Sequence, residues 1–490
     1  MTLGSPESAR RPASVAGATS AAPHVAVIGG GLAGMAAALA CADAGAKVTL
    51  LEKRGRLGGL TWSFSHDGLV MDNGQHVFLR CCTAYLDFLD RIGSAGDVFL
   101  QPRLDLTVLR ARPGRPPERA VLRRGPGPAP LHLASSLLRY RHVPAAQRAR
   151  IGLAAGALAR LDLEDPALDQ ENFEHWLQRH FQGPQAIEAL WDLICLPTVN
   201  LPAREASLAM AAKVFQTGLL SEAKAADIGW ARLPLGVLHG ERGASALRKA
   251  GASVHLGTAV RGVEKLPEGG FRVIAGGELQ ADAVVVALPH HLVEQVLPAG
   301  ALPEDVRPAH LGSSPIVNVH VHYDRPVTNL PFVAGLGTPA QWVFDRTGPS
   351  GAPRGQYLAV SVSAADSHAG TSSEELERQM VVALGELFPR AKQAKVLGTF
   401  VSREQNATFR AAPGSAAHRA PPRTRLPGLT LAGAWTSTGW PPTMEGAVRS
   451  GLAAARAALV GAGQRNHLPK VVGPARLQHL SELQQPRETT

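Results

Sequence analysis

A glycine-rich turn between an apolar strand and an alanine-rich helix constrains this 490-residue chain more than any other feature. Residues 24–29 form a short apolar run that ends in glycine, the pattern of a buried parallel strand. Gly29, Gly31 and Gly34 follow the G-x-G-x-x-G spacing and open an alanine-rich segment that stops at Gly45. A second strand, residues 47–52, completes a strand–helix–strand unit, which predicts a parallel sheet with a right-handed crossover.

Each glycine of this turn has its own task in dinucleotide binding. Gly29 permits the tight turn, Gly31 lets the backbone approach a pyrophosphate, and Gly34 lets the helix pack closely on the strand. The helix start offers unpaired N–H groups to the phosphates, and Glu52 can accept hydrogen bonds from ribose hydroxyls. The unit therefore predicts a dinucleotide site. The alternative is a glycine-rich turn in an unrelated α/β fold.

Two further segments favour FAD over a nicotinamide cofactor. Gly58 and Gly59 suit a second loop that passes close to a cofactor phosphate or flavin edge. Residues 431–435 end a late strand, and the prolines at 441 and 442 open a last helix near Met444. A helix N-terminus directed at the negative edge of a reduced flavin stabilises the reduced form, whereas a nicotinamide enzyme does not need such an element.

Composition excludes several classes of protein. The net charge of +10 comes from scattered arginines with only 5% aromatic residues, which suits an anionic membrane surface at least as well as nucleic acid. No apolar run reaches the roughly 18 residues of a membrane-spanning helix. Four irregularly spaced cysteines favour free thiols in a reducing compartment. We therefore expect no nucleic-acid partner and a cytoplasmic protein, either free or peripheral on the inner face of the membrane.

The motifs also resemble those of a known family. The glycine turn, Glu52 and residues 56–59 are similar to the flavin amine oxidase and phytoene desaturase superfamily. Residues 71–79, 81–85, 196–200 and 438–451 resemble one subgroup, the hydroxysqualene dehydroxylases, squalene-associated FAD-dependent desaturases of bacterial hopanoid synthesis. The resemblance runs from about residue 25 to 459. It implies an FAD oxidoreductase that converts a C30 isoprenoid, hydroxysqualene, to squalene with reduced flavin.

The expected fold class is α/β, with a Rossmann-type, glutathione-reductase-like FAD-binding domain and an inserted mixed helical and β substrate domain. Helical patterns at 131–163, 173–196 and 203–220, followed by returning strand patterns, underlie this division. The FAD-binding domain is expected at 23–115, 232–292 and 398–463, and the substrate domain at 116–231 and 293–397. A leader, 1–22, and a polar tail, 464–490, are expected to be disordered.

The motifs and the resemblance together give a set of expected FAD contacts. By resemblance, the backbone at Val260 contacts the adenine and the helix start at Met444 contacts the isoalloxazine. Two positions depart from the family pattern: Ala434, where an acidic residue is common, and Arg80, where glycine is usual. The expected cofactor-binding residues are Gly29, Gly31, Leu32, Ala33, Gly34, Glu52, Lys53, Arg54, Gly58, Gly59, Gly74, Gln75, His76, Val260, Gly433, Ala434, Pro442, Thr443, Met444 and Ala447.

Several polar residues have both a chemical and a structural interpretation. His76, in the loop expected to pass the flavin, either delivers a proton to a leaving hydroxyl or is a neutral imidazole hydrogen-bonded to backbone. Asp72 fits a turn or cap better than an acid, and Glu445 fits a complement to the helix dipole. His290 and His291 fit a surface loop better than a metal pair, and no metal site is expected.

Other interpretations stay open at the level of sequence. Residues 131–155 mix leucines with arginines, which is typical of a helix on a bilayer surface and also of a helix that covers the substrate domain. A carotenoid-type desaturase uses the same fold with hydride transfer in the opposite direction. An amine oxidase needs an aromatic cage, to which four tyrosines are a poor fit, and a lipid carrier would bind FAD without catalysis. No motif identifies the electron donor.

Overall fold

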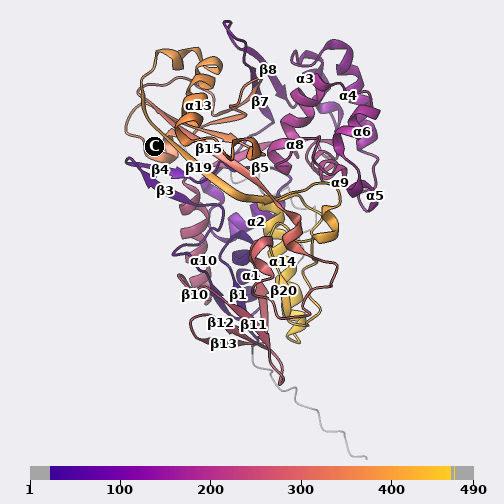
Figure 1. Ribbon diagram of the computed structural model, residues 1–490, viewed down its shortest axis with the longest axis vertical. Coiled ribbons are helices and arrows are strands. Elements are labelled where there is room, and N and C mark those ends of the chain that lie inside the picture. Colours follow the sequence, from indigo (N-terminus) through magenta and orange to yellow (C-terminus); the bar gives the residue numbers. More distant parts are fainter. Residues whose placement is uncertain (1–21, 465–467, 470–490) are drawn as a thin grey trace, which may run out of the picture.

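The computed structural model describes residues 22–464 and 468–469. Almost all of the expected leader and polar tail therefore lies outside the described residues. The described chain has two halves (Figure 1): one holds α1, α14 and β1, and the other holds the long strands β15 and β19 together with the helices α3, α4 and α6.

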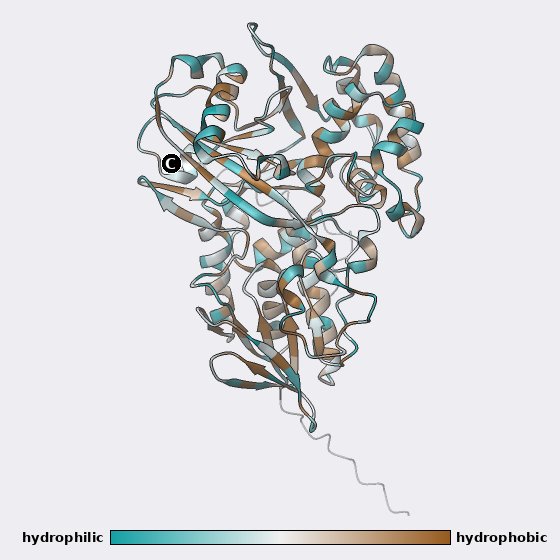
Figure 2. Cartoon of the chain, viewed as in Figure 1, coloured by the Kyte–Doolittle hydropathy of each residue, from teal (hydrophilic) through white to brown (hydrophobic). Residues whose placement is uncertain are grey.

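A five-stranded parallel sheet organises the first half, in the order β10–β2–β1–β14–β20. Its strands come from three separated parts of the chain. They are β1 (His24–Ile28), β2 (Lys47–Leu51), β10 (Ser253–His255), β14 (Ala283–Val286) and β20 (Leu429–Leu431). Figure 2 shows hydrophobic residues concentrated on these strands, as expected for parallel strands covered on both faces. The α/β class and the parallel Rossmann-type sheet predicted from the sequence are confirmed.

Two helices, α1 (Leu32–Asp43) and α14 (Met444–Gly461), pack against this sheet and each other. Small residues allow the close approach. A Cβ added at Gly34 would lie 1.9 Å from the carbonyl oxygen of Gly29, and one added at Gly451 would lie 2.1 Å from that of Ala33. Any larger side chain at these two positions would therefore push the helix off its neighbour.

A seven-stranded sheet organises the second half, in the order β19–β15–β18–β17–β16–β7–β8. The helix α13 (Ser373–Leu387) contributes its apolar face to the core over this sheet. Strand β7 lies on the FAD side of the expected boundary at 115/116, and β19 crosses the expected boundary at 397/398, yet both strands belong to this sheet. The expected domain boundaries stay a prediction. The strands are β7 (Asp105–Arg110), β8 (Glu118–Arg123), β15 (Ser313–Tyr323), β16 (Phe332–Leu336), β17 (Trp342–Asp345), β18 (Gln356–Val362) and β19 (Val396–Phe409).

The helical insertion is more broken than its sequence pattern predicts. The expected helix at 131–163 is interrupted before Pro144, because a proline disfavours helical geometry in the residue that precedes it. The expected helix at 173–196 is interrupted at Phe181, Gly183 and Pro184. The observed elements are η2 (Leu131–Leu133), α3 (Ala134–Arg139), α4 (Ala145–Leu158), α5 (Ala167–Gln170), α6 (Phe173–Arg179), α7 (Pro184–Ala186), α8 (Asp192–Val199) and α9 (Leu208–Phe215).

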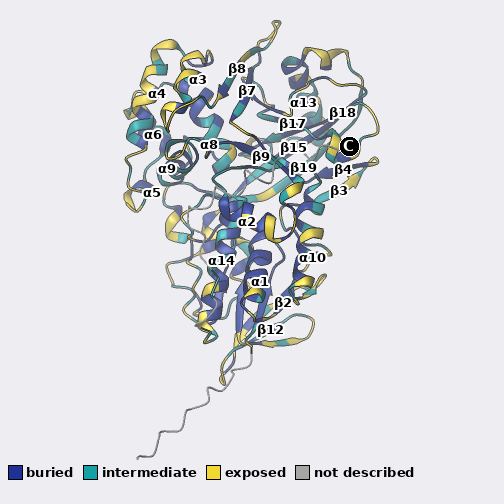
Figure 3. Ribbon diagram, turned by 180° about the vertical axis from the view of Figure 1, so that it is seen from behind, coloured by how far each residue is buried: buried dark blue, intermediate teal, exposed yellow. Residues whose placement is uncertain are grey.

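The remaining elements are short. They are β3 (Ser63–His66), β4 (Leu69–Asp72), β5 (Val77–Leu79), β6 (Val98–Leu100), β9 (Ile228–Ala231), β11 (Gly262–Lys265), β12 (Phe271–Ile274), β13 (Glu278–Ala281), α2 (Thr83–Arg91), α10 (Arg242–Lys249), α11 (His290–Val293) and α12 (Thr347–Ser350). Figure 3 shows the central strands buried and exposed residues gathered on the outer helices. Within the described part of the chain, every helix is too short or too polar to cross a bilayer.

Candidate functional site

The predicted ADP-binding residues meet at the carboxyl ends of β1 and β2. Gly31 precedes the first turn of α1, which contains Leu32, Ala33 and Gly34 and carries no acidic side chain. The Glu52 carboxylate accepts hydrogen bonds at 2.7 Å from the backbone N–H groups of Gly30 and Arg54. This is where open α/β sheets bind nucleotides.

Two glycine loops face each other at this edge of the sheet. The Gly58 N–H donates to the Gly30 carbonyl at 2.9 Å. A Cβ added at Gly59, whose φ is +59°, would lie only 2.8 Å from the Gly31 Cα. A Cβ added at Gly31 meets nothing closer than 3.8 Å. The first loop is therefore open on its outer side, and the second closes over it, which is a cradle of the kind that a pyrophosphate fits.

Charged and backbone groups surround this cradle. Lys53 and Arg54 follow Glu52 directly, and the Arg56 guanidinium donates to the Gly59 carbonyl at 3.2 Å. The segment that leads to Val260 is tied to the same strand end, because the Thr258 N–H donates to the Glu52 carbonyl at 2.8 Å. Val260 itself is half-buried. The structure thus brings the predicted adenine and ribose residues together.

A loop between β4 and β5, residues 73–76, extends from this region toward the second half. The Asn73 carbonyl accepts hydrogen bonds from Asn318 Nδ2 at 3.0 Å and from Ser402 Oγ at 3.1 Å, while Asn73 Nδ2 donates to Glu404 Oε1 at 2.9 Å. Gln75 Nε2 and Asn318 Oδ1 are buried without a hydrogen-bond partner. Buried polar atoms are normally satisfied, so these two fit a polar ligand such as a flavin ring.

His76 belongs to this loop. Its Nδ1 lies 3.3 Å from the Gly74 carbonyl oxygen, and burial lowers its pKa below the ordinary value of 6.5. A second histidine, His239, has its pKa lowered to about 3 by burial and by His76. His239 Nε2 lies 2.8 Å from the Tyr85 hydroxyl, and its Nδ1 is buried without a partner. Two imidazoles whose pKa values are lowered by burial therefore lie near the predicted flavin loop.

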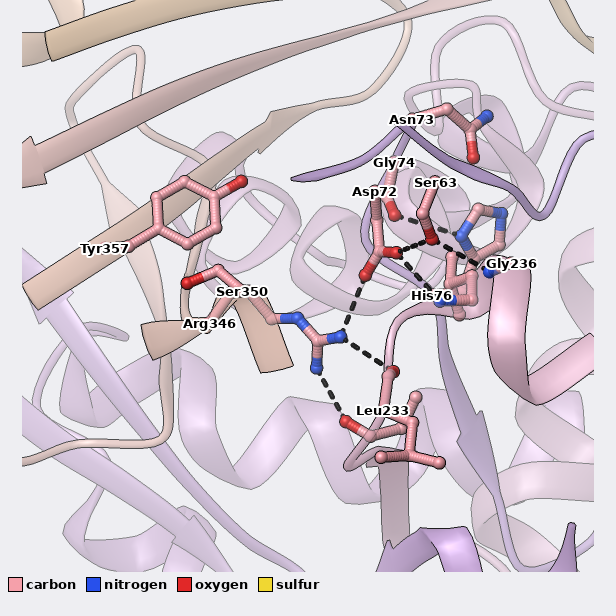
Figure 4. Close-up of polar contacts among 12 residues, drawn as sticks. Ser63, Asp72, Asn73, Gly74, His76, Leu233, Gly236, Arg346, Ser350 and Tyr357 are labelled. Carbon is pink, nitrogen blue, oxygen red and sulfur yellow. Dashed lines mark hydrogen bonds and ion pairs between the residues drawn. The ribbon is translucent and has the colours of Figure 1, made fainter. Parts of the chain in front are cut away.

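Asp72 is not the turn or cap residue that its sequence context favours. It ends β4, is buried, and forms an ion pair with Arg346, whose Nη2 lies 2.8 Å from the carboxylate (Figure 4). The Ser63 hydroxyl and the Leu235 N–H also donate to it, at 2.6 and 2.8 Å. Arg346 follows β17 in the seven-stranded sheet, so this pair joins the β3–β4 hairpin to that sheet. A small cavity beside it is lined by Asp72, Gln75, His76, Trp230, Phe344 and Arg346.

The start of α14 matches its predicted position. Thr443 caps the helix by accepting the Gly446 N–H at 3.1 Å, and the Ala447 N–H donates to the Thr443 carbonyl. Pro442 precedes the cap, and Met444 is the first helical residue. The residues that could hold the isoalloxazine thus adjoin a helix N-terminus, where the partial positive charge favours an anion.

The turn before α14 contains Ala434, the position where the family pattern has an acidic residue. Gly433, with φ of +144°, donates its N–H to Ser450 Oγ at 2.9 Å, and that hydroxyl lies 2.6 Å from Thr436 Oγ1. Ala434 is half-buried beside it. Ser450 therefore fixes the turn from the last helix, a contact that the sequence pattern did not indicate.

Arg80, the second position that differs from the family pattern, bonds to protein groups. Its Nε lies 3.0 Å from Asp227, and its Nη2 donates to the Gln101 carbonyl at 2.9 Å. Asp227 is fully buried and also pairs with Arg124. The Arg80 guanidinium is therefore part of a structural ion network.

Two minor interpretations of the sequence need correction. His290 does not lie in a surface loop: it begins α11, is buried, and contacts Ser313 Oγ through Nε2 at 3.2 Å. Glu445 does more than complement the dipole of its own helix, because its carboxylate accepts the backbone N–H groups of Ala84 and Tyr85 at 3.1 and 2.7 Å. Both corrections concern contacts between segments that are distant in sequence.

The parallel sheet, the opposed glycine loops and the late helix N-terminus define the class of FAD-binding oxidoreductases. The family model for flavin containing amine oxidoreductase matches residues 32–459, and the chain belongs to that family. Solved structures share the fold. Putrescine oxidase bound to putrescine aligns with a TM-score of 0.65 at 22% identity over 90% of this chain and 98% of that one. Cyclohexylamine oxidase from Brevibacterium oxydans aligns with a TM-score of 0.66 at 20% identity over 90% and 99%.

Sequence relatives agree with the expected subgroup. Hydroxysqualene dehydroxylase of Rhodopseudomonas palustris is 30% identical over 88% of this chain and 96% of its own length. That of Zymomonas mobilis is 28% identical over 88% and 98%. A probable zeta-carotene desaturase of Synechococcus elongatus is 24% identical over 89% and 98%. The expected resemblance is confirmed, and the chain is an FAD-dependent oxidoreductase.

Proposed function

We propose that this chain removes the hydroxyl group of hydroxysqualene reductively to give squalene, the reaction expected for hopanoid synthesis. The observation that carries the proposal is the full-length similarity to relatives named hydroxysqualene dehydroxylase, at 27–30% identity over 88–89% of the chain. Bound FAD supplies hydride when it is reduced. Loss of the hydroxyl takes up one proton and releases water, and the allylic carbon left behind takes up the hydride.

The glycine cradle and the two helix N-termini are the parts of the chain that we assign to FAD. Gly29, Gly31 and Gly34, with Gly58 and Gly59, would hold the pyrophosphate. Glu52 and the backbone at Val260 would hold the adenosine half. Residues 74–76, Gly433, Ala434 and the start of α14 at Met444 and Ala447 would frame the isoalloxazine. The orphaned polar atoms of Gln75 and Asn318 support this assignment.

The second half of the molecule is proposed to bind the isoprenoid. We keep the substrate domain at 116–231 and 293–397, and an apolar tunnel formed by the insertion and the seven-stranded sheet. Such a tunnel would orient the chain of the substrate and exclude water from an allylic cation. His76, in the loop between the halves, is the residue we propose to hold the proton for the leaving hydroxyl.

The substrate also indicates where the enzyme acts. A C30 hydrocarbon alcohol dissolves in lipid rather than in water, so we propose a cytoplasmic protein that works at the inner face of the membrane.

A single-turnover experiment tests the reaction. Chemically reduced holoenzyme, kept anaerobic with detergent-dispersed hydroxysqualene, should reoxidise its flavin and yield squalene. Oxidised enzyme given squalene or phytoene should stay oxidised. Bleaching of the oxidised flavin by phytoene, with no reaction toward hydroxysqualene, would instead support the carotenoid-type desaturase that the Synechococcus relative represents.

A further inference from the structure

The most exposed large apolar side chains of the described residues lie in one part of the sequence. Leu131, Leu138, Leu153 and Phe181 are 67%, 69%, 75% and 72% exposed, whereas the next large apolar side chain, Val382, is 54% exposed. The four belong to η2, α3, α4 and the turn after α6. These elements gather at one corner of the molecule, away from the five-stranded sheet (Figure 1).

The outer face of α4 is apolar between its arginines. Its exposed positions at 145, 146, 149, 152 and 153 carry alanine, glycine or leucine. A helix that faces water normally carries polar side chains on its outer face. Apart from Arg150, this helix presents small apolar groups and one leucine, so its outer surface fits an apolar neighbour with a negative charge.

The charged side chains of residues 131–161 are all positive. Residues 131–161 contain no Asp or Glu, and the first carboxylate that follows is Asp162. Most of the arginines are exposed on or beside α3 and α4, and Arg148 donates to the Leu138 carbonyl. The basic residues are Arg139, Arg141, Arg148, Arg150 and Arg160.

Phe181 is held outward by a strained turn. Its φ is +58°, a left-handed conformation that is a genuine outlier for a bulky side chain. The next residue, Gln182, is buried: its Nε2 donates to the Arg150 carbonyl at 3.1 Å, and its Oε1 accepts the Trp191 indole N–H at 3.0 Å. The Arg150 guanidinium lies 6.0 Å from the centre of the Phe181 ring. Local strain of this kind persists where the surrounding structure enforces it and is often functional.

We propose that this surface, consisting of α3, α4 and the Phe181 turn, docks the protein onto an anionic lipid bilayer. Leu131, Leu138, Leu153 and Phe181 insert among the acyl chains, and the arginines pair with lipid phosphates. Charge complementarity selects the occupant: residues 131–161, which carry arginines and no carboxylate, suit anionic headgroups. The proposal concerns binding alone and does not require the proposed reaction.

Vesicle co-sedimentation of the holoenzyme tests the docking surface. Vesicles of phosphatidylcholine and phosphatidylglycerol in about a two-to-one ratio should bind the protein much more strongly than vesicles of phosphatidylcholine alone. Replacing Arg139, Arg141 and Arg150 by Gln should weaken binding about fivefold per arginine, or about a hundredfold together. The matched control replaces Arg248, Lys249 and Arg390, exposed cations elsewhere, by Gln and should leave binding unchanged.

The variant Phe181→Asn separates docking from folding. Asparagine tolerates the left-handed region, so the thermal midpoint should stay equal or rise, while vesicle binding falls on the order of tenfold with the loss of one inserted aromatic ring. Val382→Asn on α13 is the control and should not change binding. Equal binding to both kinds of vesicle, or equal losses in patch and control variants, would overturn the proposal.

A second copy of the chain is the competing occupant. The alternative outcome is that the wild-type protein fails to bind vesicles and sediments as a dimer, and that Phe181→Asn dissociates this dimer. In that case the surface is a subunit interface and the lipid proposal is wrong. These measurements use no substrate. A protein that binds anionic vesicles yet fails to convert hydroxysqualene would therefore contradict only the proposed reaction.

Discussion

The Glu445 carboxylate lies 2.7 Å from the backbone nitrogen of Tyr85, a residue 360 positions earlier in the chain. Glu445 is in the first turn of α14, and Tyr85 is in the first turn of α2. One buried carboxylate thus lies at two helix N-termini. It forms an ion pair with Arg449, whose Nε lies 2.6 Å from Glu445 Oε1. The position of the helix start that we assign to the isoalloxazine therefore depends on α2.

Replacing Glu445 by Gln should destabilise the protein and loosen FAD. The change removes the buried negative charge that pairs with Arg449, and breaking a buried ion pair costs about 3 kcal/mol or more. We expect a lower thermal midpoint and faster release of FAD during gel filtration. The control is Glu374→Gln in the exposed first turn of α13, which should change neither quantity. A variant with wild-type midpoint and flavin content would show that the carboxylate is dispensable.

Gly59→Ala should remove FAD binding. The added methyl would lie 2.8 Å from the Gly31 Cα and would close the cradle between the two glycine loops. The positive φ of +59° adds about 1–2 kcal/mol of backbone strain. We expect purified protein with little bound flavin and an affinity for added FAD that is at least tenfold weaker.

The matched control for this substitution is Gly45→Ala. Gly45 follows α1 with φ of +86°, and a Cβ there meets nothing within 4 Å. It should show a similar loss of stability with normal flavin content. Equal flavin loss in both variants would assign the effect to backbone strain rather than to the cradle.

The sequence predicts the nucleotide-binding half well, because its signals are local. The strand, glycine turn, helix and Glu52 occur within 30 residues, and the structure brings them together as expected. β19 is different: it is the longest strand among the described residues, yet nearly all of its side chains are only partly buried, so no clear alternation marks it. The contacts of Asp72 with Arg346 and of Glu445 with α2 join residues hundreds of positions apart, which no local pattern indicates.

Ala434→Asp should raise FAD retention. The resemblance implies an acidic residue at this position, and a charge-assisted hydrogen bond to the cofactor is worth about 1.5–3 kcal/mol. Position 434 is half-buried next to the turn that Ser450 fixes, so a carboxylate would be held close to the predicted flavin. Titration of the apoprotein with FAD should give a roughly tenfold or greater gain in affinity. Ala369→Asp, on the surface, is the control, and unchanged or weaker affinity in Ala434→Asp would contradict the prediction.

The pH dependence of a single turnover should identify the role of His76. Burial lowers the pKa of its imidazole below 6.5, so the group is uncharged at neutral pH and gains a proton only as the pH falls through that lowered pKa. If His76 gives this proton to the leaving hydroxyl, the rate of flavin reoxidation by hydroxysqualene should rise as the pH is lowered from 7 toward and below 6. The variant His76→Gln keeps a hydrogen-bonding side chain but cannot titrate. Its rate should be lower by about 10²-fold or more and independent of pH over this range. The control is His255→Gln, a substitution of an exposed histidine at the end of β10, which should keep the wild-type dependence of the rate on pH. A wild-type rate that does not change with pH, or a His76→Gln profile that matches wild type, would leave His76 as a structural imidazole held by the Gly74 carbonyl.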